Sequence, residues 1–326
     1  MSLDGIRALV SADMTSVDSV IRTRLRSSVG LVDQVAEHII NGGGKRLRPL
    51  IVLLSAHGAC GRDQLIGEKH LHAAAFIEFI HTATLLHDDV VDRSEKRRGR
   101  LTANAVYGNQ ASVLVGDFVY SRAFQMMAAT GSQRVMEIMA DATNVIAEGE
   151  VLQLMNAHDP ETTEQRYLDV IYRKTARLFE AGAEVAAVLE GADAAAQAAL
   201  ARYGCHLGTA YQLVDDVLDY RSDPATRGKN LGEDLAEGKP TLPLIHALRH
   251  TTGEDAALIR NAITQEAPTD MTHVIGCIDR SGGIEYTRER AGRESELAIR
   301  SLDLLPASRY RDALADLARV AVQRDR

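Results

Sequence analysis

Apolar residues recur at helical spacing along most of the chain. From Leu168 onward they follow the i, i+3, i+4, i+7 pattern of an amphipathic helix, and Thr162 with Gln165 has the spacing of a capping box. Similar spacing occurs in residues 70–87, 111–129, 135–155 and 200–220. Alternating strand-like runs with hairpin turns are almost absent. The pattern therefore predicts an all-α fold.

Glycine and proline interrupt these segments without forming a domain linker. The interruptions fall at residues 42–44, 58–61, 131, 159–160, 191, 224–232 and 282–283. No repeat of fixed period is visible at the level of whole helices. Since 326 residues can share one helical core, we expect a single domain over residues 1–326 with about ten or more helices.

The composition indicates a folded protein with a net negative charge. Hydrophobic residues make up 45% of the chain, and 37 Lys and Arg against 45 Asp and Glu give a formal charge of -8. A disordered chain and nonspecific binding to nucleic acid are therefore not expected. The longest uncharged runs fall short of the ~20 apolar residues that span a bilayer, so no transmembrane helix is expected.

The N-terminus and the cysteines favour a cytoplasmic protein. The chain begins MSLDGIRALVSADM, which has an early acidic residue and lacks the apolar stretch of a secretory signal. Cys60, Cys205 and Cys277 are odd in number, widely separated, and without the C-x-x-C spacing of a metal site. We expect them to be reduced core thiols.

An acidic pattern, Asp-Asp-x-x-Asp, occurs twice, at residues 88–92 and 215–219. In the first copy Asp88 and Asp92 lie on one face of a helix, and the second copy repeats this spacing. Two unit charges ~4 Å apart repel by about 4 kcal/mol at an effective dielectric of 20, so such a pair needs a proton or a cation. Carboxylate ligands on rigid helices suit Mg²⁺, which completes its shell with water and phosphate oxygens. One copy alone is equally well a solvated helix end, but two copies favour a metal site.

Two basic clusters accompany the first acidic motif. Residues 43–49 read GGKRLRP, a glycine-rich turn that delivers cations to the start of a helix, as in an anion site. Residues 96–100 read KRRGR, which alone is more often a solvated basic turn. Beside a carboxylate–metal cluster, such groups can bind one diphosphate through Mg²⁺ and a second one directly.

Further polar residues near the motifs carry weaker signals. His81 precedes the first acidic motif, and by itself it is more often a hydrogen-bonded histidine of the core or its boundary than a ligand. Lys229 and Lys239 follow the second motif in a loop that could reach a phosphate but is equally well a plain surface loop.

Together the motifs resemble those of the trans-polyprenyl diphosphate synthase family. The segments GGKRLRP, LLHDDVVDRSEKRRG, RKTARLFEAG, YQLVDDVLDY and GKNLGEDLAEGKPTLPL stand in the family's order, and the likeness covers nearly the whole chain. It is strongest to the bacterial members that form octaprenyl diphosphate. The resemblance implies an isoprenoid-synthase helical bundle around a deep central cavity, a homodimer, and elongation of an allylic diphosphate such as farnesyl diphosphate by isopentenyl diphosphate. The product would serve as a precursor of the ubiquinone side chain.

The resemblance also implies roles for individual residues. Mg²⁺ would be bound by Asp88, Asp92 and Asp215, while Asp89, Asp216 and Asp219 support them. Isopentenyl diphosphate would be bound without metal by Lys45, Arg48, His81 and Arg98. The groups expected to face the allylic diphosphate are Arg97, Lys174, Thr175, Gln212, Lys229 and Lys239. Among these, catalytic roles are expected for Lys174, Thr175, Gln212 and Lys229. One departure is Tyr211, where the family usually has Phe.

The implied mechanism is ionisation, condensation and elimination. Mg²⁺ and cationic side chains would stabilise the departing pyrophosphate, and the isopentenyl double bond would attack the allylic cation. Thr175 and Gln212 could stabilise that cation through their dipoles. The final proton could go to the released pyrophosphate, so no protein base is required.

Product length is expected to depend on small side chains before the first acidic motif. Thr84 and Ala83 stand four and five residues before Asp88, or ~6 and ~7.5 Å along a helix. Short-chain members carry aromatic residues there, so an open tunnel and a long product are expected. Met127 and Met139 are candidates for the tunnel floor, and equally well ordinary core methionines.

Other functions remain open at this stage. A different chain length, such as nonaprenyl, is compatible with the same motifs. A class I terpene synthase would share the fold but normally has a different second metal motif and no need for GGKRLRP. A non-catalytic partner subunit is disfavoured by the two intact acidic motifs.

Overall fold

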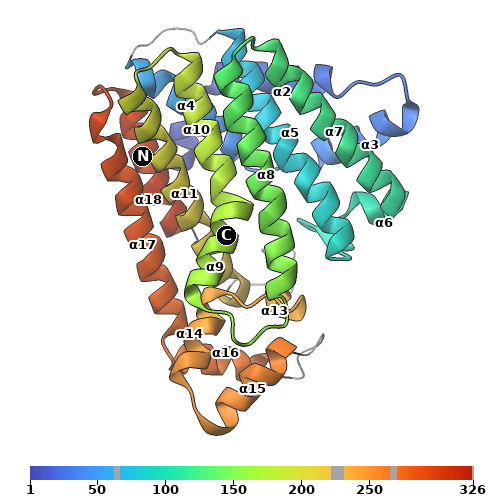
Figure 1. Ribbon diagram of the computed structural model, residues 1–326, viewed down its shortest axis with the longest axis vertical. Coiled ribbons are helices and arrows are strands. Elements are labelled where there is room, and N and C mark those ends of the chain that lie inside the picture. Colours follow the sequence, from blue (N-terminus) through green and yellow to red (C-terminus); the bar gives the residue numbers. More distant parts are fainter. Residues whose placement is uncertain (62–66, 222–230, 265–269, 325–326) are drawn as a thin grey trace. The chain divides into compact units, whose positions relative to one another are not determined.

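The structure, a computed structural model, describes residues 1–61, 67–221, 231–264 and 270–324. It is almost entirely helical (Figure 1), so the predicted all-α class is confirmed. Contacts divide the chain into two compact units. Unit 1 comprises residues 1–143, 178–204 and 299–317, and unit 2 comprises residues 144–177, 205–298 and 318–326. A single domain around a central cavity stays a prediction.

Unit 1 contains the first seven helices and one short hairpin. The helices are α1 (Leu3–Ala8), α2 (Ser11–Arg24), α3 (Gly30–Asn41), α4 (Leu47–Cys60), α5 (Glu68–Val91), α6 (Ala103–Tyr107) and α7 (Asn109–Ala129). Strands β1 (Lys96–Arg97) and β2 (Arg100–Leu101) pair antiparallel. The second basic cluster is therefore a small hairpin. Its strands are too short to show an alternating pattern in the sequence.

Some helices contribute residues to both units. Each of the other helical segments lies within a single unit. The shared helices are α8 (Gln133–Asn156), α10 (Arg177–Leu189), α11 (Ala194–Arg221), α17 (Gly283–Ser301) and α18 (Arg309–Gln323). Unit 2 also holds α9 (Glu164–Ile171), η1 (Tyr172–Ala176), α13 (Glu233–Ala236), α14 (Leu242–His250), α15 (Gly253–Thr264) and α16 (Met271–Arg280). The 3₁₀ turn η2 (Leu302–Leu304) lies in unit 1.

The core of unit 1 forms where helices are apolar on every side. Residues 49–58 of α4 are all buried, which is typical of a helix surrounded by others. Helices α5 and α7 lie side by side (Figure 1) and approach closely at Gly116. A Cβ there would lie 2.4 Å from the His87 Nε2 atom, so only glycine permits this contact. The close approach fixes the end of α5 that carries the first acidic motif.

Unit 2 has a separate apolar cluster on its C-terminal helices. Leu244 of α14, Ile259 of α15 and Ile278 of α16 are fully buried within it. Val217 and Tyr220 of α11 belong to the same cluster, so it supports the helix that carries the second acidic motif.

The helix predicted from Leu168 differs from the structure in two respects. Its N-cap is Thr163, whose hydroxyl accepts a hydrogen bond from the Arg166 amide at 3.2 Å, rather than Thr162 with Gln165. The helix also changes to π-helical geometry at η1 before continuing as α10. Hydrophobic spacing does not reveal such a turn, because it adds only one residue to the repeat.

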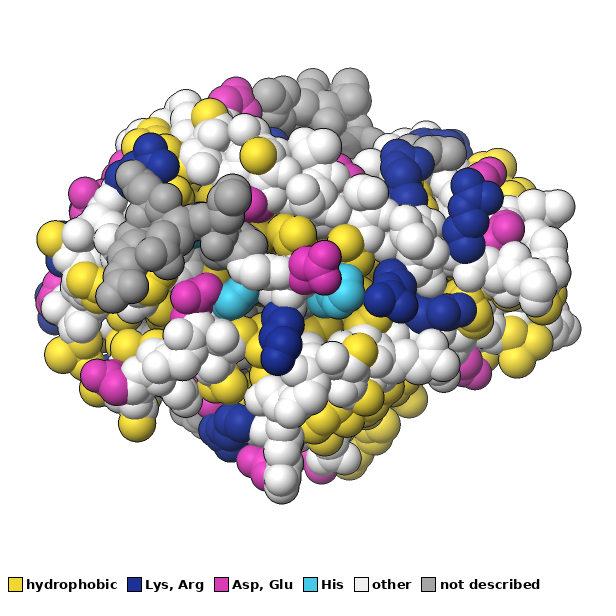
Figure 2. Space-filling model, turned by 90° about the horizontal axis from the view of Figure 1, so that it is seen from above, with side chains coloured by type: hydrophobic (Ala, Val, Ile, Leu, Met, Phe, Trp, Pro, Cys, Tyr) yellow, Lys and Arg dark blue, Asp and Glu magenta, His cyan; other side chains and the backbone are white. Residues whose placement is uncertain are grey.

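Charged side chains of both signs are mixed on the face drawn in Figure 2. Lys, Arg, Asp and Glu side chains are all visible there among hydrophobic ones, and several Lys and Arg side chains gather toward the right of the view. Among the helices that the structure describes, none combines the length and the apolar character that a membrane span requires.

Candidate active site

The first acidic motif ends helix α5, and its carboxylates have two different environments. Asp88 and Asp92 are half-buried and lie one turn apart, with the Asp92 amide donating to the Asp88 carbonyl at 2.8 Å. Asp89 is buried and is bound by Arg97, whose Nε and NH2 atoms lie 2.9 and 2.7 Å from its Oδ1 atom. Burial raises the pKa of Asp89, although Arg97 opposes this effect. Arg97, predicted to face the allylic substrate, therefore holds the middle carboxylate of the motif.

The two basic clusters meet at the glycine-rich turn. Arg98 donates through NH1 to the Gly43 carbonyl at 2.5 Å, and a Cβ at Gly44 would lie 2.6 Å from the same nitrogen. Gly44 has a φ of 155°, and the turn continues into α4 through Arg46 in a left-handed conformation. The glycines therefore let the hairpin arginine lie directly against the turn.

Gly43, Arg46 and Arg98 line a small cavity that is partly open to solvent. His81 and Arg98, both predicted to bind isopentenyl diphosphate, are among its lining residues. Burial lowers the pKa of His81 well below its usual value, and the charges of Arg48 and Arg98 lower it further. The imidazole is therefore neutral at pH 7 and can donate or accept a hydrogen bond without adding charge.

Lys45 and Arg48 do not line this cavity. Lys45 is exposed, and its carbonyl accepts a hydrogen bond from the Arg7 side chain at 2.5 Å. Arg48 stacks over the Phe179 ring, with 4.6 Å from its guanidinium carbon to the ring centroid. Arg48 is still close enough for its charge to act on His81, so its predicted role in substrate binding stays a prediction.

The cavity includes charged residues that the sequence reasoning did not single out. Arg46 donates to the Glu78 carboxylate at 2.7 Å, and Arg100 is a further cation of the lining. Arg46 and Arg100 belong to the two basic clusters, so their sequence position could have indicated that they lie at the site. Glu78 lies three residues before His81, on an apolar helix where a buried acid requires a cationic partner.

The residues predicted to line a product tunnel are buried within unit 1. Ala83 on α5, Met127 on α7 and Met139 on α8 are fully buried. Thr84 is half-buried and donates its hydroxyl to the His81 carbonyl at 2.8 Å, so its polar group is satisfied by its own helix. This burial fits both a tunnel wall and an ordinary core, and the tunnel stays a prediction.

The second acidic motif lies near the end of α11 and has an arginine bound to it. Arg324 NH1 lies 2.8 Å from the Asp215 Oδ1 atom, and its guanidinium carbon lies 3.6 Å from the centre of the Tyr211 ring. The same guanidinium donates to the Tyr211 carbonyl. The position where the sequence departs from the family's Phe is therefore a stacking platform, and its hydroxyl is not needed for this contact.

Hydrogen bonds connect Gln212, Thr175 and the buried Asp216. The Thr175 hydroxyl donates to Gln212 Oε1 at 3.0 Å, and Gln212 Nε2 donates to Asp216 Oδ1 at 2.9 Å. The Tyr167 hydroxyl donates to the other Asp216 oxygen. Burial raises the pKa of Asp216 well above its usual value, and the neighbouring Asp234 carboxylate adds to this. Asp216 thus positions Gln212, as expected of a supporting carboxylate.

Lysine side chains of unit 2 are held by acidic neighbours. Lys174 donates through Nζ to Glu150 Oε2 at 2.6 Å and to Gln153 Oε1 at 2.7 Å. Lys239 donates to Glu237 Oε2 at 2.6 Å. Glu150 and Gln153 lie on α8, and nothing in their local sequence indicated this role. Lys229 lies outside the described residues.

Asp219 is buried and stabilises the backbone after α11. Its Oδ2 atom accepts a hydrogen bond from the Asp234 amide at 3.3 Å, and its carbonyl accepts one from the Gly232 amide at 2.9 Å. It therefore ties α13 to α11, and the half-buried Asp215 of the same motif interacts with Arg324.

Each acidic motif by itself offers oxygen donors that suit a hard divalent cation. Asp88 and Asp92 offer carboxylate oxygens from consecutive turns of α5, and Asp215 attracts a guanidinium charge to its own oxygen. Ligands made of oxygen alone are those that Mg²⁺ prefers.

Comparisons with known proteins agree with this chemistry. Residues 29–279 match the family described as Polyprenyl synthetase. The octaprenyl diphosphate synthase of Escherichia coli is 53% identical over 100% of both chains. An all-trans-nonaprenyl-diphosphate synthase of Rhodobacter capsulatus is 47% identical over 98% of this chain and 97% of its own.

A solved structure shows the same fold. The polyprenyl synthase of Caulobacter crescentus, complexed with calcium and isoprenyl diphosphate, superposes with a TM-score of 0.94 at 44% identity over 100% of this chain and 98% of that one. The chain therefore belongs to the polyprenyl synthetase family of prenyltransferases, as its motifs predicted.

Proposed function

We propose that the protein is a long-chain trans-polyprenyl diphosphate synthase whose product is octaprenyl diphosphate. It would condense isopentenyl diphosphate repeatedly onto an allylic diphosphate such as farnesyl diphosphate. The observation that carries the proposal is the first acidic motif on α5, which adjoins a cavity lined by arginines and a neutral histidine. The full-length identity to a bacterial octaprenyl diphosphate synthase supports the product.

Asp88, Asp92 and Asp215 are the proposed Mg²⁺ ligands. When bound, the metal would neutralise the allylic diphosphate and act as a Lewis acid toward the leaving pyrophosphate. Asp89 would keep its bond to Arg97, which fixes both the motif and the hairpin. Arg324 NH1 lies 2.8 Å from Asp215 Oδ1. Arg324 would leave this oxygen when the metal binds, because the guanidinium and the metal would compete for it. The calcium named for the Caulobacter relative supports a divalent cation here.

The cavity beside α5 is the proposed site for the diphosphate of isopentenyl diphosphate. Arg98 and His81 line it, and Arg46 and Arg100 add positive charge. Arginine pairs well with phosphate oxygens because its guanidinium forms parallel hydrogen bonds. Lys45 and Arg48 would complete the site from the glycine-rich turn.

The allylic substrate is assigned to residues of unit 2 together with Arg97. Lys174 and Lys239 would stabilise the departing diphosphate, and Lys229 would join them. The Thr175 oxygen and the Gln212 amide are fixed by their hydrogen bonds, so their dipoles are oriented before the allylic cation forms. The elimination proton would leave with the pyrophosphate, since the mechanism needs no protein base.

Chain length in this proposal is set by steric limits. The small Ala83 and Thr84 side chains would leave room for the product beside α5, and Met127 and Met139 would close the tunnel deeper in unit 1. A nonaprenyl product is the alternative, as the named activity of the Rhodobacter relative illustrates.

We also infer a homodimer in the cytoplasm that supplies the ubiquinone side chain. Large apolar side chains are exposed on α7, at Val113 and Leu114, and on α8, at Val151, Leu154 and Met155. Exposed apolar residues that cluster on a helix are typical of subunit interfaces.

The test is to incubate the purified chain with Mg²⁺, farnesyl diphosphate and labelled isopentenyl diphosphate, and to separate the dephosphorylated products by length. A dominant octaprenyl band is expected. A different long product would retain the chemistry and correct the tunnel. Products formed without isopentenyl diphosphate would indicate a terpene synthase, and no turnover by the chain alone would indicate a partner subunit.

A further inference from the structure

A second group of metal-ligand side chains lies in unit 2 and shares no residue with the candidate active site. It consists of Asp255 in the first turn of α15 and of His273 and Cys277 on α16. One ligand atom of each lies within 4.8 Å of the other two. Sequence spacing does not indicate this group, because Asp255 comes from another helix and Cys277 has no nearby cysteine.

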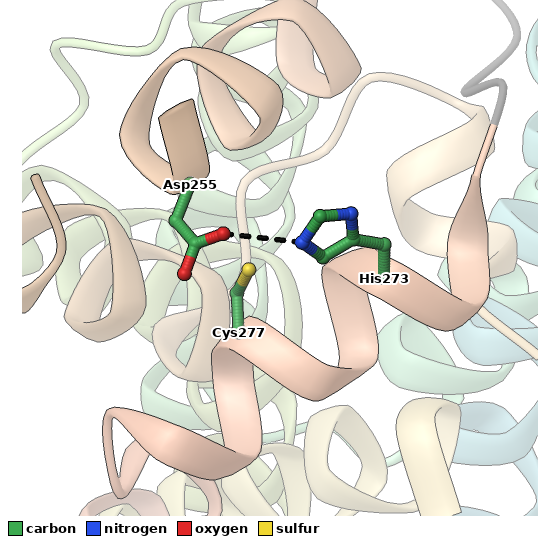
Figure 3. Close-up of side chains that lie close together, drawn as sticks. All are labelled: Asp255, His273 and Cys277. Atoms are coloured by element: carbon green, nitrogen blue, oxygen red, sulfur yellow. Dashed lines mark hydrogen bonds and ion pairs between the residues drawn. The ribbon is translucent and has the colours of Figure 1, made fainter. Parts of the chain in front are cut away.

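The side chains converge from the two helices, as Figure 3 shows. His273 and Cys277 are four residues apart, so they lie on one face of α16. The His273 Nε2 atom is 3.1 Å from Asp255 Oδ1. Neighbouring ligands of a tetrahedral zinc ion with bonds of about 2.0–2.3 Å are about 3.3–3.8 Å apart. At 3.1 Å the pair is slightly closer than this spacing, and shifts of about 1 Å would open the pair and bring in the sulfur.

The surrounding core holds this geometry in place. Cys277 is fully buried in the apolar cluster that also contains Ile259 of α15 and Val274 of α16. Asp270 caps α16 by accepting a hydrogen bond from the His273 amide at 3.0 Å. Both helices are therefore fixed at the ligands, while His273 and Asp255 remain partly accessible, with 47% and 33% of their side chains exposed.

A cation already occupies part of the cluster. Arg280 NH2 lies 2.7 Å from Asp255 Oδ2 and 3.3 Å from Cys277 Sγ. Its side chain is 57% exposed, so it can turn into solvent without crossing the core. The bound guanidinium indicates that Asp255 and the neighbouring Cys277 sulfur attract positive charge.

We propose that Asp255, His273 and Cys277 bind a divalent transition metal such as Zn²⁺, which displaces Arg280. Sulfur and imidazole ligands select such a metal over Mg²⁺, and the fourth position would hold water. Cys277 would bind the metal as a thiolate, so binding would release its proton to solvent. Because the ligands come from α15 and α16, the metal would fasten these helices together. The proposal is independent of the prenyltransferase reaction.

The experiment is a Co²⁺ titration of the full chain in excess Mg²⁺, which fills carboxylate-only sites. A thiolate-to-cobalt charge-transfer band is expected in wild type and in the control C60S, and it should be absent in C277S. His273→Ala should weaken Co²⁺ binding by about tenfold or more, and R280A should tighten it by removing the competing cation.

Thermal unfolding gives a second measure. Zn²⁺ should displace Co²⁺ and so abolish the charge-transfer band. At a fixed Zn²⁺ concentration the Tm should rise in wild type and C60S, rise less in H273A, and stay unchanged in C277S. The idea fails if the band is missing in wild type, if it survives in C277S, or if R280A leaves the affinity unchanged. Because His273 is largely at the surface, its variant tests the site even if C277S does not fold.

Discussion

Arg324 and Asp215 form an ion pair of 2.8 Å at the carboxylate that the proposed reaction assigns to Mg²⁺. The arginine is 10% exposed and stacks on Tyr211 of the same helix as Asp215. The C-terminal segment thus supplies the positive charge that this motif requires when no metal is bound.

Replacing Arg324 with Ala should therefore destabilise the metal-free protein. The loss of a charged hydrogen bond and of ring stacking should cost about 1–2 kcal/mol. In saturating Mg²⁺ the loss should be smaller, since the metal takes over as counterion. Thermal unfolding of wild type and R324A with and without Mg²⁺ measures this, and R319A on α18 is the control. An equal loss in both conditions would contradict the assignment.

Replacing Asp88 with Ala should abolish most of the turnover while the protein stays folded. A proposed metal ligand contributes several kcal/mol to leaving-group stabilisation, so kcat should fall by about 10²- to 10³-fold. Calorimetric Mg²⁺ binding in the presence of a non-reactive allylic analogue should weaken in parallel. The exposed Glu137 on α8 offers a matched control, E137Q. Near-normal turnover of D88A would contradict the proposed function.

Arg98→Ala should weaken the binding of isopentenyl diphosphate far more than that of the allylic substrate. Removing a charged donor to a phosphate costs about 1.5–3 kcal/mol, which is about a 10- to 100-fold rise in KM for isopentenyl diphosphate. Arg98→Lys should recover part of the loss, because lysine retains the charge but not the paired geometry. Steady-state kinetics with each substrate varied in turn distinguishes this result from a general loss of fold.

Ala83→Phe should shorten the product. The added ring would fill space beside α5 one turn before Asp88, and over-filling a buried site costs about 1–3 kcal/mol of stability. Ala73→Phe, at an equally buried position farther from the motif on α5, should lower stability without shortening the product. Product chromatography and thermal unfolding of both variants are compared. Unchanged product length in A83F would remove Ala83 from the tunnel.

Stability should fall as the pH drops below about 6.5. Burial lowers the pKa of His70 in the folded state despite the Glu190 carboxylate 3.1 Å away, whereas the unfolded histidine keeps its value of 6.5. The unfolded state therefore binds the proton first, so the free energy of unfolding is constant above pH 6.5 and declines as pH falls toward the folded pKa. His81 acts in the same direction. Denaturant unfolding from pH 7.5 to 5 should show a smaller decline in H70Q.

Much of the fold was predictable, because helical spacing depends on local pattern. The predicted helices over residues 70–87 and 200–220 lie inside α5 and α11. The hairpin of the second basic cluster and the π turn at η1 could not be found this way, since both depend on contacts made after folding. At the π turn, η1 packs closely against Gly149 of α8. A Cβ at Gly149 would lie 2.6 Å from the Cβ atom of Arg173.

For the candidate site, too, the local features were predictable and the contacts made on folding were not. The spacing of each acidic motif is local, so Asp88 and Asp215 could be singled out from sequence. The partners of those motifs are distant in sequence: Arg324 reaches Asp215 from the C-terminal segment, and Glu150 reaches Lys174 from α8. No local pattern indicates which of several surface charges will make such a contact.

The π turn makes the site depend on helical phase as well as on residue identity. Each residue of a regular helix turns the chain by about 100°, so deleting Tyr172 would restore α-helical spacing while rotating Lys174 and Thr175 against α9 by about that angle. Every motif residue would still be present, yet Thr175 would no longer face Gln212. In this segment a change in length should therefore disturb the site even when no functional residue is lost.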